Sequence, residues 1–252
     1  TGKQAGPPIL FAHCYGCDQN MWRLVWPAFE ETHRIVLFDH VGSGSSDLTQ
    51  YDFEKYGTLE GYADDILEIC DELALEEVVF VGHSVAAMMG VLAAKKRPEQ
   101  FSKLVLVGPS PRYIDDGEYV GGFSSAEIDD LLTSLESNFL GWSAQMAPLI
   151  MGNSDRPELG TELTNSFCRT DPDISAHFAK VTFRSDNRKD LPSVPVPTLV
   201  LQCSDDIIAP TDVGEYVAST LPHGRFHQLR ATGHCPNLSA PDETIEAIKA
   251  FL

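Results

Sequence analysis

The chain has 252 residues, of which 43% are hydrophobic, and this suits one large domain with a substantial core. Its net charge of −19 argues against a nucleic-acid partner, because phosphate binding needs clustered Lys and Arg, and it disfavours docking on anionic membranes. No apolar run approaches the length of a membrane span, and no charged-then-apolar signal segment opens the sequence. We therefore expect a cytoplasmic protein whose partners are neither nucleic acid nor membrane.

Six cysteines are spread widely along the chain, which is typical of reduced thiols rather than of a secreted disulfide framework. Cys14-x-x-Cys17 has the spacing of a redox pair. Together with His13, His234 and Cys235, it is also compatible with a zinc site. A lone CxxC lacks the second ligand pair of a structural zinc site, so neither assignment is specific. We predict no metal and no cofactor.

Short β-branched runs alternate with helical periodicity along most of the chain. This alternation predicts an α/β fold, with a mostly parallel sheet covered by helices on both faces. In chain order, the predicted strands are 9–12, 33–38, 78–81, 103–107, 198–202 and 225–229. The predicted helices begin at Asp18, Thr58, Val85, Thr211 and Pro241.

Residues 110–190 break this alternation and contain no convincing strand. Ser124-Ser125-Ala126-Glu127 has the pattern of a capping box, and Asp173 is a candidate helix cap. We expect a core formed by residues 1–109 and 191–252, interrupted by a helical lid at 110–190. Apolar side chains of the lid would line a pocket for a small apolar substrate. They could equally well form the lid's own hydrophobic core. The candidate pocket residues are Phe123, Trp142, Met146, Phe178 and Phe183 from the lid, and Ile207 from the core.

The segment Gly82-His83-Ser84-Val85-Ala86 follows an apolar run and precedes a helix-compatible stretch. A serine on a sharp turn between a strand and a helix is the nucleophile elbow typical of α/β-hydrolases. The turn strains the serine backbone, so the residues two positions before and two positions after the serine must be small. Gly82 and Ala86 occupy these positions, and both are small. Ser84 is therefore the predicted nucleophile, while His83 is expected to have a packing role rather than a catalytic one.

Among the eight histidines, His234 has the best context for a general base. It lies between the last predicted strand and the last predicted helix, and the order Ser, acid, His is the one that this fold uses. The base needs a carboxylate to hold its tautomer. Asp205 and Asp206 both follow the strand at 198–202. Because neighbours in an extended chain face opposite ways, only one of them can reach His234.

Acyl transfer also needs preorganised donors for the developing oxyanion. One predicted donor is the backbone N–H of Val85, directly after the nucleophile. The other is the backbone N–H of Tyr15, in the loop after the first predicted strand.

Taken together, these segments resemble a branch of the α/β-hydrolases that contains the bacterial stress-response regulator RsbQ and the plant karrikin and strigolactone receptors. The resemblance is closest to RsbQ around Asp206 and His234, and it implies a Ser84–His234–Asp206 triad. It also implies a four-helix lid above an enclosed apolar pocket, with Tyr15 and Val85 as oxyanion donors. The resembling segments are 16–19, 38–44, 62–65, 82–85, 97–99, 108–113, 121–123, 202–210 and 233–236.

The chain departs from this family pattern at three positions. Cys14 replaces a glycine common before the oxyanion residue, and Tyr15 stands where phenylalanine is usual. Ala86 follows the receptor-like pattern of a small residue rather than the glycine of RsbQ. Tyr15 therefore adds a hydroxyl at the mouth of the predicted pocket.

Two functions are compatible with this site. The first is a serine hydrolase that cleaves a small ester, lactone or butenolide-like compound. The second is a ligand-sensing regulator, in which the pocket binds or slowly hydrolyses a signal and the lid then engages a protein partner, such as a phosphatase in stress signalling. A carbon–carbon bond hydrolase using the same triad is a weaker alternative, because no residue here marks its dienoate-type substrate.

Overall fold

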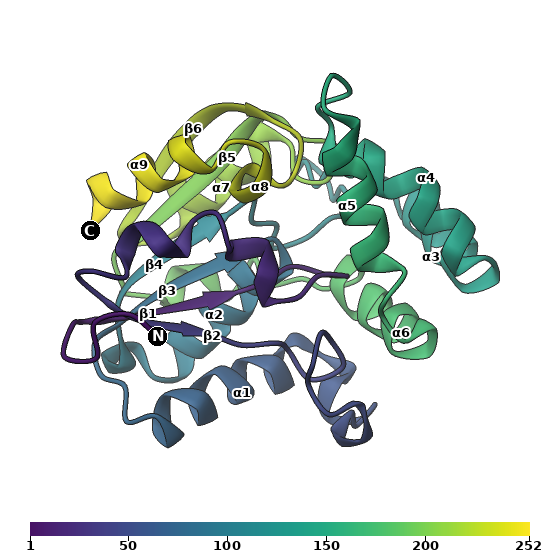
Figure 1. Ribbon diagram of the computed structural model, residues 1–252. Coiled ribbons are helices and arrows are strands. Elements are labelled where there is room, and N and C mark those ends of the chain that lie inside the picture. Colours follow the sequence, from purple (N-terminus) through teal and green to yellow (C-terminus); the bar gives the residue numbers. More distant parts are fainter.

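Six segments pair into one sheet, in which every neighbouring pair of strands is parallel (Figure 1). The structure, a computed structural model, describes residues 1–252. The strand order is β2-β1-β3-β4-β5-β6. The strands span β1 Pro8–Ala12, β2 Arg34–Leu37, β3 Val78–His83, β4 Phe101–Val107, β5 Thr198–Asp205 and β6 Gly224–Thr232.

Helices flank this sheet: α1 packs on α2, α2 packs on β3 and β4, and α7 and α9 pack on β5 and β6. None of the helices combines the length and the hydropathy that crossing a membrane requires. The α-helices span α1 Leu59–Glu72, α2 Val85–Lys96, α3 Ser125–Ser137, α4 Phe139–Met151, α5 Pro157–Phe167, α6 Pro172–Phe183, α7 Thr211–Thr220, α8 Pro236–Ser239 and α9 Pro241–Phe251.

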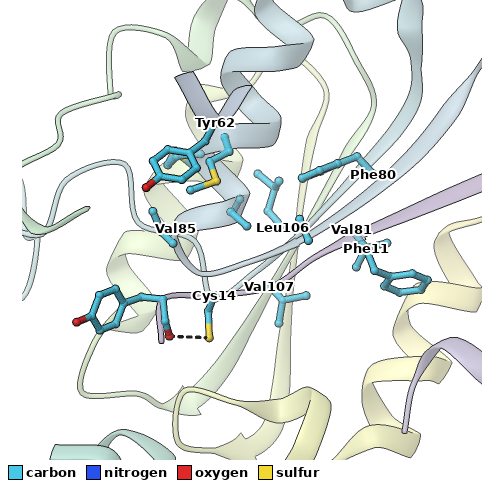
Figure 2. Packing of buried hydrophobic residues seen from close by; sticks show 14 of the residues in the cluster. Phe11, Cys14, Tyr62, Phe80, Val81, Val85, Leu106 and Val107 are labelled. Carbon is cyan, nitrogen blue, oxygen red and sulfur yellow. Dashed lines mark hydrogen bonds between the residues drawn. The ribbon is translucent and has the colours of Figure 1, made fainter. Parts of the chain in front are cut away.

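The predicted α/β architecture is confirmed, and each of the six predicted strands is present within a few residues of its expected bounds. All six residues of β3 are buried, which explains its continuous apolar sequence, since a strand covered on both faces needs no polar alternation. Figure 2 shows Phe80 and Val81 of β3 close to Leu106 of the neighbouring strand β4, within the buried core.

Three predicted helix starts need correction. The helix expected from Asp18 is instead two short 3-10 helices, Gln19–Trp22 and Trp26–Phe29, and Pro27 lies in the first turn of the second, where no backbone N–H is needed. Thr58 precedes α1, but its side chain makes no capping hydrogen bond. Helix α6 is capped by Asp171 and not by Asp173, because Pro172 occupies its first position.

Between β4 and β5 lie four helices, α3–α6, and no strand, as the sequence predicts. Figure 1 shows that these helices, called here the helical insertion, gather together at one end of the sheet. The predicted capping box is present in α3, where the Ser124 hydroxyl accepts from the Glu127 N–H at 3.2 Å and the Glu127 carboxylate accepts from the Ser124 N–H at 2.7 Å.

The order of the strands determines where the loops meet. From β1 the chain passes to β2 on one side and then to β3 on the other, and Ala12 at the end of β1 lies opposite Gly82 in β3. A crevice forms at such a reversal of strand order, beyond the carboxyl ends of the strands. The loops that carry Tyr15 and Ser84 therefore face the same space.

Replacing Ser124 with Ala should lower the free energy of unfolding by about 1 kcal/mol, because the first turn of α3 loses its side-chain acceptor. Ser134→Ala, an exposed change within the same helix, should stay within about 0.5 kcal/mol of the parent. Urea denaturation of the three proteins measures both values, and equal losses for the two variants would contradict the capping assignment.

Candidate active site

Ser84 connects β3 to α2 and has an unusual backbone conformation, with φ of 58°. Its N–H donates to Val107 O at 2.8 Å, and its carbonyl accepts the first hydrogen bond of α2, from the Ala87 N–H, at 2.9 Å. A Cβ on Gly82 would lie 2.6 Å from the Phe80 ring and 2.8 Å from the Ala86 carbonyl oxygen, so the turn has no space for a larger residue there. The strained turn that the sequence predicts is thus present.

The Ser84 hydroxyl, His234 and Asp206 form one buried chain of hydrogen bonds. Ser84 Oγ lies 2.8 Å from His234 Nε2, and His234 Nδ1 lies 2.7 Å from Asp206 Oδ2. With its proton on Nδ1, the imidazole donates to the carboxylate and accepts the serine O–H. This is the geometry of a nucleophile with an oriented general base.

Of the two neighbouring carboxylates, only Asp206 reaches the histidine. Its Oδ1 accepts from the Ile208 and Ala209 N–H groups at 2.9 and 3.2 Å, whereas Asp205 is exposed at the end of β5. Burial alone would raise the pKa of Asp206, but the adjacent His234 and these N–H donors lower it below its ordinary value. Asp206 is therefore ionised at neutral pH.

Both backbone polar groups of His234, the N–H and the carbonyl, form hydrogen bonds. Its N–H donates to Ile150 O of α4 at 2.8 Å, and its carbonyl accepts from His83 Nε2 at 2.7 Å. Gly108, after β4, faces the ring: a Cβ there would lie 3.2 Å from His234 Cε1. His83 therefore packs, as predicted, and also fixes the loop that carries His234.

Burial lowers the pKa of His83 to about 3, so this imidazole is neutral at neutral pH. Two further buried histidines support the loop after β1. His40 Nε2 donates to His13 O at 3.0 Å, and His13 Nδ1 donates to Cys14 O at 2.9 Å. Burial lowers the pKa of both rings as well. The loop that carries Tyr15 is therefore held by hydrogen bonds to neutral imidazoles.

The two predicted oxyanion donors lie on either side of Ser84. Val85 is the first residue of α2, where backbone N–H groups have no partner within the helix. Tyr15 lies in the loop after β1, the strand adjacent to β3. Its side chain is buried and lines the same cavity as Ser84.

A cavity of about 30 Å³, with room for roughly two water molecules, lies directly over Ser84. Its wall is mostly apolar and is formed by the core and the insertion together. The lining residues are Cys14, Tyr15, Ser84, Tyr113, Ile150, Leu163, Phe167, Thr182, Phe183, Ile208, His234 and Cys235. Burial raises the pKa of the Cys14 and Cys235 thiols, so both are protonated at neutral pH and are poor nucleophiles.

Of the six predicted pocket residues, only Phe183 lines this cavity. Trp142 and Phe178 are buried against Tyr15, with ring centroids 6.4 and 5.6 Å from it, and so lie one layer further out. Phe123 and Met146 are half-buried elsewhere in the insertion. Ile207 does not line the cavity either: its side chain is 47% exposed, and the neighbouring Ile208 lines the cavity instead.

Sequence reasoning missed most of the wall. Tyr113 follows the carboxyl end of β4, where parallel strands bring their loops together, so its position was a usable signal. Leu163 and Phe167 are four residues apart on α5 and so share one face, which helical spacing could also have indicated. Ile150 and Thr182 carry no such signal.

Residues 9–247 match the model of the Alpha/beta hydrolase family, and the chain belongs to this family. Strigolactone esterase D14 of Arabidopsis thaliana is 41% identical over 249 residues, which cover 98% of this chain and 93% of that protein. Karrikin insensitive 2 receptor CA of Petunia hybrida is 37% identical over 249 residues, covering 98% and 91%. A solved structure of a hydrolase from Oleispira antarctica superimposes with a TM-score of 0.96 at 37% identity, covering 100% of this chain and 92% of that one.

These relatives confirm the predicted fold family and the similarity to plant strigolactone and karrikin receptors. The finer resemblance to the bacterial regulator RsbQ stays a prediction.

The neutral state of His83 predicts a loss of stability in acid. Because the unfolded chain protonates this histidine near pH 6.5 and the folded chain only near pH 3, its contribution is complete above pH 6.5 and declines as the pH falls. One such group costs up to about 1.4 kcal/mol per pH unit in that window. His83→Gln, which keeps an N–H donor without titrating, should lose about 2 kcal/mol less than the parent between pH 7.5 and 5.0.

Urea unfolding at the two pH values measures this difference. His223→Gln, the same change at an exposed histidine, is the matched control for the substitution itself. If His83→Gln kept the parental dependence, His83 would be protonated in the folded protein, contrary to the structure.

Proposed function

We propose that this α/β-hydrolase is a serine hydrolase that cleaves a small ester, lactone or butenolide-like compound. The observation that carries the proposal is the continuous Ser84–His234–Asp206 chain, with contacts of 2.8 and 2.7 Å, at a strained strand-to-helix turn. The relatives named as an esterase in Arabidopsis thaliana and as a 3-oxoadipate enol-lactonase in Acinetobacter baylyi support this substrate class, the latter at 22% identity.

In the proposed mechanism, Ser84 Oγ attacks the substrate carbonyl carbon while His234 Nε2 takes the serine proton. Asp206 stabilises the imidazolium through Nδ1–H, and the N–H groups of Val85 and Tyr15 bind the oxyanion. His234 then gives the proton to the departing alkoxide as the tetrahedral intermediate collapses. The alcohol leaves, and the acyl group stays on Ser84. Water, activated by His234, releases the acid and restores the serine.

We propose that the helical insertion acts as a lid over this site, at residues 110–190 between the two parts of the core. Its helices supply Ile150, Leu163, Phe167 and Phe183 to the cavity wall, and an apolar wall favours a small, fairly apolar substrate. Covering the site also limits the access of water to the acyl intermediate.

The second candidate function is signal sensing with slow turnover. The cavity has only about 30 Å³ over Ser84, so a ligand requires movement of the insertion, and such a movement can be read by a protein partner. The Petunia hybrida relative is named as a receptor, which agrees with this possibility. A phosphatase-type partner and a cytoplasmic location stay predictions of the sequence.

Ser84→Ala should lower kcat/KM for p-nitrophenyl acetate by at least about 10⁴-fold while leaving the circular dichroism spectrum unchanged, since the variant has no nucleophile. Mass spectrometry of the quenched parent reaction should detect an acyl adduct that the variant lacks, provided that deacylation is slow. Undiminished hydrolysis by the variant would refute the assignment of Ser84. The turnover rate of the parent separates a metabolic enzyme from a slow sensor.

Asp206→Asn should lower kcat by about 10⁴-fold, because the amide cannot hold the productive tautomer of His234. Asp205→Asn is the matched control, the same change at the adjacent exposed position, and should stay within a few-fold of the parent. Equal losses in the two variants would contradict the assignment of the acid.

A further inference from the structure

The Tyr15 side chain joins the loop after β1 to the helical insertion. Its hydroxyl lies 2.6 Å from Ser175 Oγ and donates to the Ser175 carbonyl oxygen at 3.2 Å. Ser175 is buried on α6, 160 residues away in the sequence. A phenylalanine at this position would have no atom to make this connection.

Three insertion helices surround the Tyr15 ring. Its centroid lies 6.4 Å from Trp142 of α4, 5.7 Å from Phe167 of α5 and 5.6 Å from Phe178 of α6. The rings of Trp142 and Phe167 are themselves stacked, at 5.9 Å. Tyr15 thus contacts aromatic side chains from three insertion helices, although Tyr62 of α1 also stacks on Phe178, at 4.8 Å.

Tyr15 also lines the small cavity over Ser84, so its side chain occupies room that a larger substrate would need. Moving this ring either moves α6 with it or breaks the contacts of the Tyr15 hydroxyl with both oxygen atoms of Ser175. The phenol is buried and donates to the Ser175 carbonyl, so separating the two without a replacement partner is costly.

From these contacts, we infer that the Tyr15–Ser175 pair is a specificity determinant that restricts Ser84 to small ester or lactone substrates by holding α6 against the loop after β1. This inference rests on the proposed serine hydrolase function. Substrates with small acyl groups reach Ser84 after only a small displacement of the insertion. Substrates with longer chains react only when the Tyr15–Ser175 contact breaks and α6 moves away.

The test is a comparison of p-nitrophenyl acetate, butyrate and octanoate as substrates of the parent, Ser175→Ala and Tyr15→Phe. The readout is the ratio of kcat/KM for octanoate to that for acetate. In both variants this ratio should rise: by about tenfold in Tyr15→Phe, the change expected when a buried hydrogen bond no longer opposes opening, and by less in Ser175→Ala, which keeps the carbonyl acceptor. Tyr15→Phe removes both contacts of the hydroxyl, whereas Ser175→Ala leaves the Ser175 carbonyl as an acceptor, so the double variant should show the same ratio as Tyr15→Phe.

Ser143→Ala is the matched control for loosening of the insertion in general. Ser143 is also buried in the insertion, but its hydroxyl donates to Phe139 O within α4 at 2.8 Å and does not contact Tyr15. The ratio of kcat/KM for octanoate to that for acetate should be the same in Ser143→Ala as in the parent. A ratio within about twofold of the parent in both Ser175→Ala and Tyr15→Phe would overturn the inference.

Hydrogen exchange of the α6 amides gives a readout that does not need catalysis. Exchange in α6 should be faster in Ser175→Ala than in the parent or in Ser143→Ala. If the parent hydrolysed none of the esters and formed no adduct, the proposed function would fail, and the exchange rates would still decide whether the contact holds α6. Equal exchange in all three proteins would overturn that role.

Discussion

The backbone of Ser84 carries the constraint on which the rest of the site depends. A φ of 58° is costly for a residue with a side chain, and it persists only where the surroundings determine it fully. Here the surroundings are the central strand β3, which is buried throughout, the hydrogen bond from Ser84 N–H to Val107 O, and the first turn of α2. The core of the protein, rather than a flexible loop, therefore fixes the direction of the hydroxyl.

The electrostatics of the site follow from the same burial. Desolvation keeps the imidazole of His83 neutral and the thiols of Cys14 and Cys235 protonated, whereas Asp206 stays ionised because His234 and two backbone N–H groups stabilise its charge. Close to Ser84, the Asp206 carboxylate therefore contacts the His234 imidazole, and the neighbouring His83, Cys14 and Cys235 side chains carry no charge. The positive charge that His234 gains when it takes the serine proton is balanced by Asp206 and by no other buried carboxylate in contact with it.

The sequence predicted the strands and the Ser84 turn well, because both depend on local patterns: continuous apolar runs, small residues around the serine, and the order of the chain. The local pattern could not choose between Asp205 and Asp206, since both follow β5, and only the turn that places Ile208 and Ala209 N–H groups on Asp206 distinguishes them. The cavity wall was predicted poorly. Its residues come from eight separate segments of the chain, and which face of an insertion helix turns inward depends on how the insertion packs on the core.

The hydrogen bond from His234 N–H to Ile150 O makes the insertion part of the support of the general base. Asn153, just after α4, strengthens this attachment by donating through Nδ2 to Thr232 O at 2.9 Å. The end of α4 therefore belongs structurally with the loop after β6, although in sequence it lies within the insertion. If the insertion of this protein were exchanged, a junction before Ile150, with residues 150–153 left in the recipient core, would keep both of these hydrogen bonds.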